Sequence, residues 1–387
     1  MDSHVDRLKV LVAGVVSLVL MLGIARFAYT PLMPVMQLQA GLGISEGGWL
    51  ASINYIGYLS GAIIAASISS MALKDKLYRI GLVLAVISTL AMMLTTNIIL
   101  WALMRYLAGL SSAAGLLIGS GLVLNWLIRH GYRSELGLHF SGVGLGIALV
   151  SLASALMVNA LDWQQQWLGL AIVSLILAIP AWVWMPRPDI NSHQMKSGQH
   201  LQDTPPPVVF SRLLMAAYFC AGVGYVISAT FIVAIVNEQS HSANAGNWVF
   251  LVLGAGAAPA CYLWDRVARL CGDIPALFIA YLIHTVSIML PAFNEDIVTA
   301  YISAFLFGAT FMGIVSLVLS MAGRFYPTKP AKMMGKMTIS YGCAQIIAPA
   351  VTGYVAHWTG SYSQGLLMAG IFMILGSILV YQLRNRI

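Results

Sequence analysis

The sequence predicts an all-α membrane protein with twelve transmembrane helices, and three observations indicate this fold class. Of its 387 residues, 59% are hydrophobic and 9% are charged, whereas about a quarter of a soluble domain is Asp, Glu, Lys or Arg. The apolar runs are long and continuous rather than alternating, which favours helices over a β-barrel. The basic residues between these runs occur in every second loop, as expected for helices that cross a membrane in alternating directions.

The apolar runs fall into two sets of six. A helix needs about 20 apolar residues to cross the hydrocarbon core, and this length predicts spans at 9–36, 46–72, 78–95, 98–128, 135–159, 164–185, 209–237, 244–264, 274–293, 297–323, 333–357 and 363–383. Residues 186–208 are polar and contain five prolines, so they can neither span a membrane nor pack into a core. We therefore expect six-helix bundles at 1–185 and 209–387, joined by a cytoplasmic linker at 186–208.

Lysines and arginines outside the spans predict the orientation of the helices. They occur in the even-numbered loops and at the chain ends, whereas the odd-numbered loops contain only acids, such as Asp162, Glu238, Glu295 and Asp296. The basic residues are Arg7, Lys9, Lys74, Lys76, Arg79, Arg129, Arg133, Arg187, Lys196, Arg212, Arg266, Arg269, Arg324, Lys329, Lys332, Lys336, Arg384 and Arg386. By the positive-inside rule, both termini are cytoplasmic, in a multi-pass protein of the bacterial inner membrane. Because the net charge of +7 belongs to membrane-flanking loops, no nucleic acid partner is expected.

The sequence contains no pattern typical of an enzyme or an ATP-driven pump. It has no phosphate-binding loop, and no paired acids or Ser–His pair fall within the spans. Three of the four cysteines lie in apolar runs, and their spacing indicates neither a disulfide nor a metal site. We expect no enzymatic activity, no cofactor and no metal.

Two segments repeat one pattern at equivalent positions of the two halves. Residues 73–79 and 263–269 both fit L-x-D-[KR]-x-x-R in the loops expected after spans two and eight. The charged positions are Asp75, Lys76 and Arg79 in the first copy, and Asp265, Arg266 and Arg269 in the second. A carboxylate at a helix end can cap the N-terminus of a neighbouring helix and pair with arginine. We expect both segments to latch one closed conformation.

These segments resemble the cytoplasmic loop signature of the major facilitator superfamily (MFS), whose full form carries two further glycines. Arg105-x-x-x-Gly109 is similar to the arginine motif in the fourth helix of that superfamily. Residues 23–31 and 224–231 look like segments of the YbfB/YjiJ-type MFS proteins, and this resemblance extends along nearly the whole chain. It implies a monomeric transporter with two pseudo-symmetric bundles, which rock about a central cavity lined by spans 1, 4, 7 and 10.

Arg26 and Arg105 are the only basic residues well inside the predicted spans, since the others lie in loops, tails or span ends, and every acid can be placed in a loop, a tail or a span end. An arginine at a helix centre costs about 2.5–3.5 kcal/mol, so neither is expected to face lipid. At 1.5 Å per residue, Arg26 lies about 16 Å and Arg105 about 10 Å from the outer ends of their spans. A guanidinium can hold a carboxylate or phosphate with two hydrogen bonds, which favours an anionic substrate.

Alternatives to substrate binding remain for both arginines. Arg26 can be neutralised by backbone carbonyls and tyrosines in a structural or gating role, or paired with Glu46 or Glu238. A conformational or coupling role is favoured for Arg105. Candidate partners in a binding site are polar or aromatic residues of neighbouring spans: Tyr29, Asn54, Tyr55, Tyr58, Tyr225, Ser228, Thr230, Tyr341 and Gln345.

The sequence does not identify the ion or exchange reaction that would drive transport. His139 and His284 lie within spans, and an imidazole with an ordinary pKa near 6.5 can carry a proton. Both are also explained as packed, hydrogen-bonded residues, and anion exchange needs no titrating side chain. We expect a secondary active transporter that moves a small anionic organic solute by alternating access. The alternatives are a proton-coupled multidrug or metabolite exporter, which would be expected to place a carboxylate in the cavity, and a non-transporting sensor of the same fold.

Overall fold

The computed structural model of the chain describes residues 3–130, 132, 136–188, 204–325 and 331–384. These residues form helices and short connections, and no strand occurs among them. Eleven helices are long and apolar enough to cross a membrane, and a twelfth span is formed if the bent pair α10 and α11 is counted as one. The predicted all-α class is confirmed, and so is the prediction of many membrane-spanning helices.

The first half of the chain supplies six of these spans. The first consists of α1 (Ser3–Leu18), the π-helix η1 (Val19–Phe27) and α2 (Tyr29–Gln39), and the second is α3 (Ile44–Ser67). The third is α4 (Met71–Ala91) with η2 (Met92–Leu94), and the fourth consists of α5 (Ile98–Ala113), η3 (Ala114–Gly119) and α6 (Ser120–Arg129). The fifth and sixth are α7 (Leu136–Met157) and α8 (Trp163–Val183).

The second half contains seven helices. They are α9 (Val208–Ser240), α10 (Ala245–Ala257), α11 (Ala260–Cys271), α12 (Asp273–Phe293), α13 (Ile297–Phe325), α14 (Ala331–Thr359) and α15 (Ser363–Leu383). Helices α10 and α11 meet at an angle of 45°, next to Pro259. The first backbone hydrogen bond of α11 runs from the Leu263 N–H to the Pro259 carbonyl. Helix α11 ends at Cys271, seven residues beyond the span end predicted at 264.

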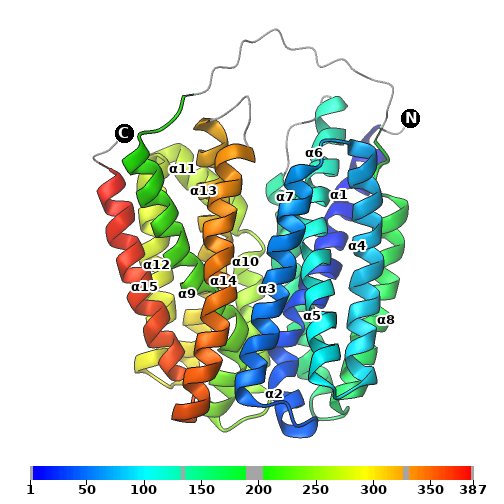
Figure 1. Cartoon of the computed structure of the whole chain (residues 1–387), viewed down its shortest axis with the longest axis vertical. Coiled ribbons are helices and arrows are strands. Elements are labelled where there is room, and N and C mark those ends of the chain that lie inside the picture. Colours follow the sequence, from blue (N-terminus) through cyan, green and yellow to red (C-terminus); the bar gives the residue numbers. More distant parts are fainter. Residues whose placement is uncertain (1–2, 131, 133–135, 189–203, 326–330, 385–387) are drawn as a thin grey trace.

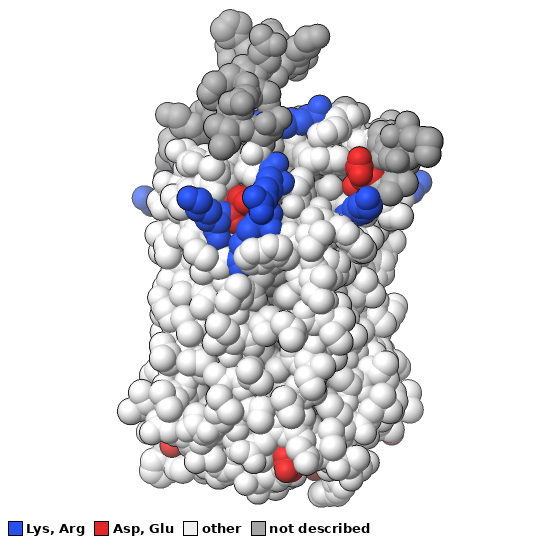
Figure 2. All heavy atoms as spheres, turned by 90° about the vertical axis from the view of Figure 1, so that its right-hand side faces the viewer, with Lys and Arg blue, Asp and Glu red and all other residues white. Residues whose placement is uncertain are grey.

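The helices stand side by side, and the first and last described residues lie at the same end of the molecule (Figure 1). We call this end the terminal end and the opposite one the far end. Of the predicted linker, residues 189–203 lie outside the described residues. On the face shown in Figure 2, Lys and Arg gather near the terminal end together with some acids, whereas the charged residues visible at the far end are acids. The membrane-spanning surface between them is free of charge in this view.

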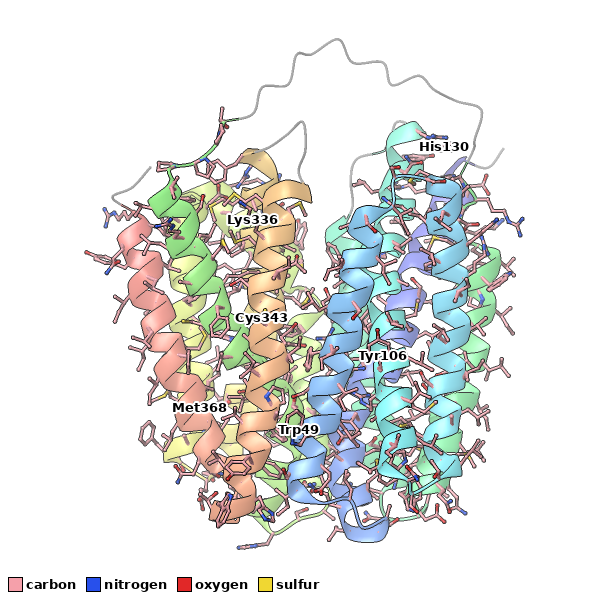
Figure 3. The ribbon with its side chains drawn as sticks, in the orientation of Figure 1. Trp49, Tyr106, His130, Lys336, Cys343 and Met368 are labelled. Atoms are coloured by element: carbon pink, nitrogen blue, oxygen red, sulfur yellow. The ribbon has the colours of Figure 1, made fainter. Side chains whose placement is uncertain are left out.

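The most extensive contacts between the halves are those of α3 with α14 and of α7 with α10. Their backbones touch at glycines. A Cβ atom on Gly48 of α3 would lie 2.4 Å from the Pro349 carbonyl oxygen of α14, and one on Gly144 of α7 would lie 2.3 Å from the Ala258 nitrogen. Trp49, which follows Gly48, lies toward the far end in Figure 3. Any larger residue at these positions would push the two halves apart.

Side-chain hydrogen bonds also link the halves toward the far end. The Thr30 hydroxyl donates to the Ala229 carbonyl at 2.8 Å, and the Asn244 amide donates to the Ala155 carbonyl at 3.0 Å. Both bonds join residues of α2 or α7 to residues of the second half. The far end is therefore closed in this conformation.

Candidate functional site

Arg26 lies near the end of the π-helix η1, and its side chain is buried with only 6% of the residue exposed. Its guanidinium carbon lies 4.4 Å from the ring centre of Tyr55 and 4.8 Å from that of Tyr58. These tyrosines are three residues apart on α3, so they lie on the same face of that helix. A desolvated cation over an aromatic face gains about 2 kcal/mol, which offsets part of the cost of burying Arg26.

The second half contributes further tyrosines to the surroundings of Arg26. Tyr225 of α9 and Tyr341 of α14 are close enough to interact electrostatically with the guanidinium. The Tyr341 ring stacks on Tyr225 at 5.8 Å and on Tyr218 at 4.5 Å between ring centres. Arg26 therefore lies between the two halves and is surrounded by phenol rings from both.

Within the described residues, no Asp or Glu forms an ion pair with Arg26. Its Nε atom is inaccessible to solvent and has no hydrogen-bond partner there. The predicted alternative of pairing with Glu46 or Glu238 does not occur in this conformation. A buried cation without a carboxylate is a strong attractor for an anion.

Arg105 occupies the neighbouring space but bonds to the backbone. Its Nη1 atom donates to the Ala25 carbonyl at 3.2 Å, and its guanidinium lies 4.4 Å from the ring centre of Tyr29. A π-helix shifts the backbone bonding pattern by one residue, and Pro31 has no N–H to donate. Arg105 therefore donates hydrogen bonds to backbone carbonyls at the end of η1, an irregular turn of the helix. Tyr106, the next residue, lies at middle depth in Figure 3.

Two more of the predicted residues belong to this backbone network. The Asn54 amide donates to the Arg105 carbonyl at 2.8 Å, and the Tyr29 hydroxyl donates to the Gly47 carbonyl at 2.9 Å. Both bonds lie within the first half and tie α2, α3 and α5 together, and the bonds of Arg105 add η1 to this network. Tyr29, Asn54 and Arg105 therefore support Arg26 and hold it in place.

The remaining predicted site residues, Ser228, Thr230 and Gln345, do not all lie in one cavity. Ser228 lines a small cavity of about 10 Å³ inside the second half, together with Ser287 and Ser303, and its hydroxyl has no partner among the described residues. Gln345 and Thr230 are buried, and the Gln345 Oε1 atom is likewise unpartnered in the described part of the chain. Ser228 thus lines a separate cavity, within the second half.

Sequence reasoning missed two contributors to the region between the halves. Tyr218 stacks on Tyr341, and Thr30 bonds across to Ala229. Neither stands out in the sequence, because a tyrosine or threonine in a transmembrane helix is common in packing. Spans 2 and 11 also supply more of the aromatic wall than the resemblance implied, since Tyr55, Tyr58 and Tyr341 lie on α3 and α14.

The two histidines are buried within their own halves. His284 bonds through Nδ1 to the Thr310 hydroxyl at 2.7 Å, and its ring packs against Phe307. His139 bonds through Nε2 to the Ser120 hydroxyl at 2.9 Å. These contacts are those of packed, hydrogen-bonded residues. A role for either histidine in proton transfer stays a prediction.

The repeated L-x-D-[KR]-x-x-R segments lie in helices rather than in loops. Ser70 caps α4, which begins at Met71, so Asp75 and Arg79 are one turn apart on α4 and pair at 3.1 Å. Arg79 also donates to the Trp182 carbonyl at 2.7 Å and the Met185 carbonyl at 3.5 Å, at the end of α8. The arginine thus caps a helix C-terminus, where a positive charge is favourable, whereas we expected the carboxylate to cap an N-terminus.

The second copy is arranged differently. Asp265 and Arg269 pair one turn apart on α11, but both side chains are exposed. Arg266 donates to the Tyr262 hydroxyl at 2.8 Å, and the corresponding residue of the first copy, Lys76, is exposed. The two copies share a sequence pattern and an intrahelical ion pair, but only the first is docked on another helix.

Comparisons with known proteins agree with this architecture. Residues 18–381 match the model of a family described as "uncharacterised MFS-type transporter YbfB". The chain is 23% identical to the "probable sulfoacetate transporter SauU" of Cupriavidus necator, over 89% of this chain and 86% of that protein. The crystal structure of a mutant of the nucleoside transporter NupG superposes with a TM-score of 0.76 at 12% identity, and covers 98% of this chain and 99% of that one. Since the family match extends over nearly the whole sequence, the chain belongs to the YbfB-type family of MFS transporters.

Proposed function

We propose that this protein is a secondary active transporter that moves a small organic anion across the bacterial cytoplasmic membrane by alternating access. The observation that carries this proposal is Arg26, a buried cation between the two halves with no carboxylate partner among the described residues. Its surroundings supply aromatic walls for the organic part of a solute. The guanidinium supplies donors for an oxyanion such as a carboxylate or sulfonate.

The similarity to SauU supports the same chemical class. Sulfoacetate carries a carboxylate and a sulfonate on a two-carbon skeleton, and a transporter named for it handles a small organic anion. We extend this class, though not this particular substrate, to the present chain. Residues 1–185 and 209–387 would act as the two moving bundles, with the terminal end facing the cytoplasm because the basic loops lie there.

The test is binding and transport by the purified protein and by two variants. Arg26→Gln removes the buried charge and keeps a side chain of similar length, whereas Arg212→Gln removes an exposed charge from α9. A panel of small carboxylates and sulfonates is screened for thermal stabilisation, since a ligand stabilises the state that it binds. Stabilising anions are then tested for uptake into proteoliposomes.

We expect at least one anion to stabilise the wild type and Arg212→Gln but not Arg26→Gln, and the same anion to be transported. The proposal fails if Arg26→Gln binds and transports anions as the wild type does. Transport of cations or neutral drugs, with no anion bound by any of the three proteins, would instead support the exporter alternative. Binding of an anion without any flux into proteoliposomes would support a sensor.

A further inference from the structure

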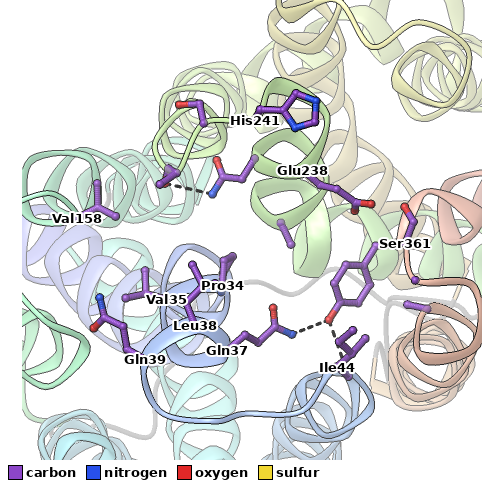
Figure 4. A pocket seen from close by; sticks show the side chains of 17 residues that line it. Pro34, Val35, Gln37, Leu38, Gln39, Ile44, Val158, Glu238, His241 and Ser361 are labelled. Atoms are coloured by element: carbon purple, nitrogen blue, oxygen red, sulfur yellow. Dashed lines mark hydrogen bonds between the residues drawn. The ribbon is translucent and has the colours of Figure 1, made fainter.

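A pocket of about 460 Å³ lies between the two halves at the far end (Figure 4). The first half contributes the end of α2, the start of α3 and the connection after α7. The second half contributes the ends of α9 and α14 and the connections that follow them. This volume is within the range of about 300–1,000 Å³ typical of sites for small organic molecules. The pocket is separate from the surroundings of Arg26, because neither Arg26 nor its tyrosines line it.

Charge in and around the pocket is negative. Glu238, near the end of α9, is the acid that lines it, and no Lys or Arg does so. Among the described residues Glu238 has no ion-pair partner. The connections at this end, residues 40–43, 95–97, 158–162, 241–244, 294–296 and 360–362, contain no Lys or Arg. The potential at the far end therefore favours cations.

Tyr362 gives the pocket an aromatic wall and joins its two sides. The ring stacks on Phe231 of α9 at 4.6 Å between centres. Its hydroxyl accepts from the Gln37 amide of α2 at 2.8 Å and donates to the carbonyl of Ile44, the first residue of α3, at 3.4 Å. Burial and the nearby Glu238 carboxylate raise the pKa of Tyr362 to about 12, against the opposing effect of the Gln37 bond. The phenol thus stays neutral and adds no charge to that of the Glu238 carboxylate.

We propose that this far-end pocket is a second binding site, specific for a small organic cation of the substituted-ammonium class. Glu238 supplies the counter-charge, and the apolar side chains of Val35, Leu38 and Ile44 supply contact surface for carbon substituents. The ring of Tyr362 adds attraction for a cation, as aromatic faces do for quaternary ammonium groups. The two sites of the molecule thus select ligands of opposite charge.

The position of the pocket gives such a ligand an effect on conformation. The walls come from both halves, and the hydroxyl of Tyr362 bonds to α2 and α3 of the first half only while the far ends are together. A cation that needs both walls binds the far-end-closed state and stabilises it relative to the open state. It therefore inhibits anion transport without occupying the space around Arg26. This consequence rests on the proposed transport function, whereas the binding site itself does not.

The test uses the full-length protein and benzyltrimethylammonium chloride as the probe, titrated by calorimetry at constant ionic strength. Controls are sodium chloride and benzyl alcohol, which separate general salt and aromatic effects from cation recognition. Glu238→Gln removes the pocket charge, and Glu295→Gln removes an exposed acid from the same end that does not line the pocket. Ser361→Lys keeps Glu238 and adds a positive charge to the lining.

We expect saturable binding of the probe to the wild type and to Glu295→Gln, and binding roughly tenfold weaker or absent in Glu238→Gln and Ser361→Lys. Melting curves without the probe establish that each variant is folded. No saturable binding to the wild type, equal binding to Glu238→Gln, or equal binding of benzyl alcohol overturns the proposal. Arg26→Gln separates the two proposals, because it should bind the probe as the wild type does even where anion transport is lost.

Discussion

Arg105 donates from both of its terminal nitrogens to the backbone carbonyl of Arg26, each at 3.4 Å. The two arginines of the membrane interior are thus connected through the main chain, and their roles are different. Arg105 uses its donors on the irregular turn that carries Arg26. The guanidinium of Arg26 remains surrounded by aromatic rings from both halves, with no carboxylate partner among the described residues. This arrangement suits Arg105 for positioning and Arg26 for binding.

Replacement of Arg105 by Gln is expected to lower stability and to weaken binding of the anion. The variant loses hydrogen bonds from a charged group to the carbonyls of Ala25 and Arg26, and each such bond contributes about 1.5–3 kcal/mol. Thermal unfolding in detergent measures the first effect, with Arg212→Gln as the control for an exposed arginine. A melting temperature equal to that of the wild type would show that the π-helix does not need Arg105.

Replacement of Arg26 by Lys tests whether geometry matters as well as charge. Lysine keeps the positive charge but lacks the planar fork that holds an oxyanion with two hydrogen bonds. We expect the affinity for the stabilising anion to fall by roughly tenfold or more, with the melting temperature of the ligand-free protein little changed. If Arg26→Lys binds as tightly as the wild type, the site needs only a positive charge.

The contact between α3 and α14 should control access from the far end. Gly48→Val places side-chain atoms where the Pro349 carbonyl already lies, 2.4 Å from an added Cβ, so the far ends are forced apart. Gly335→Val on α14 is the matched control, because nothing lies within 4 Å of a Cβ there. The readout is labelling of Ala234→Cys, which lines the far-end pocket, by a membrane-impermeant maleimide. The exposed Cys271 is replaced by Ser in all variants.

Labelling of Ala234→Cys should increase in the Gly48→Val background and stay at its original level with Gly335→Val. Equal labelling in all backgrounds would mean that the glycine contact does not hold the far end closed.

The two copies of the L-x-D-[KR]-x-x-R segment should differ in their importance for stability. Arg79→Gln removes bonds to the Trp182 and Met185 carbonyls along with a largely buried ion pair, at a cost of about 1.5–3 kcal/mol for each lost charged bond. Arg269→Gln removes an exposed intrahelical pair, and solvent screening leaves such pairs with little effect on stability. Thermal unfolding of both variants is compared, and equal losses of stability would contradict the docking of Arg79 on α8.

The composition and hydropathy of the sequence determined that the protein is a bundle of membrane-spanning helices. Lipid offers no hydrogen bonds, so a long apolar segment must satisfy its own backbone as a helix. The same reasoning identified Arg26 and Arg105 as candidate functional residues, because placing a charged side chain inside a membrane has a large free-energy cost. The motifs were sufficient to indicate the superfamily and the family.

Only the tertiary structure decided what each of these residues contacts. The π-helix η1, which carries Arg26, packs against α7, α5 and α4, and no periodicity in the sequence predicts it. Arg79 and Arg269 occupy the same place in a repeated motif, yet only Arg79 reaches the end of another helix. Tyr225 and Tyr341 meet Arg26 from a distant part of the chain. Such contacts depend on how two halves approach each other, and sequence patterns report mainly the periodicity within a single helix.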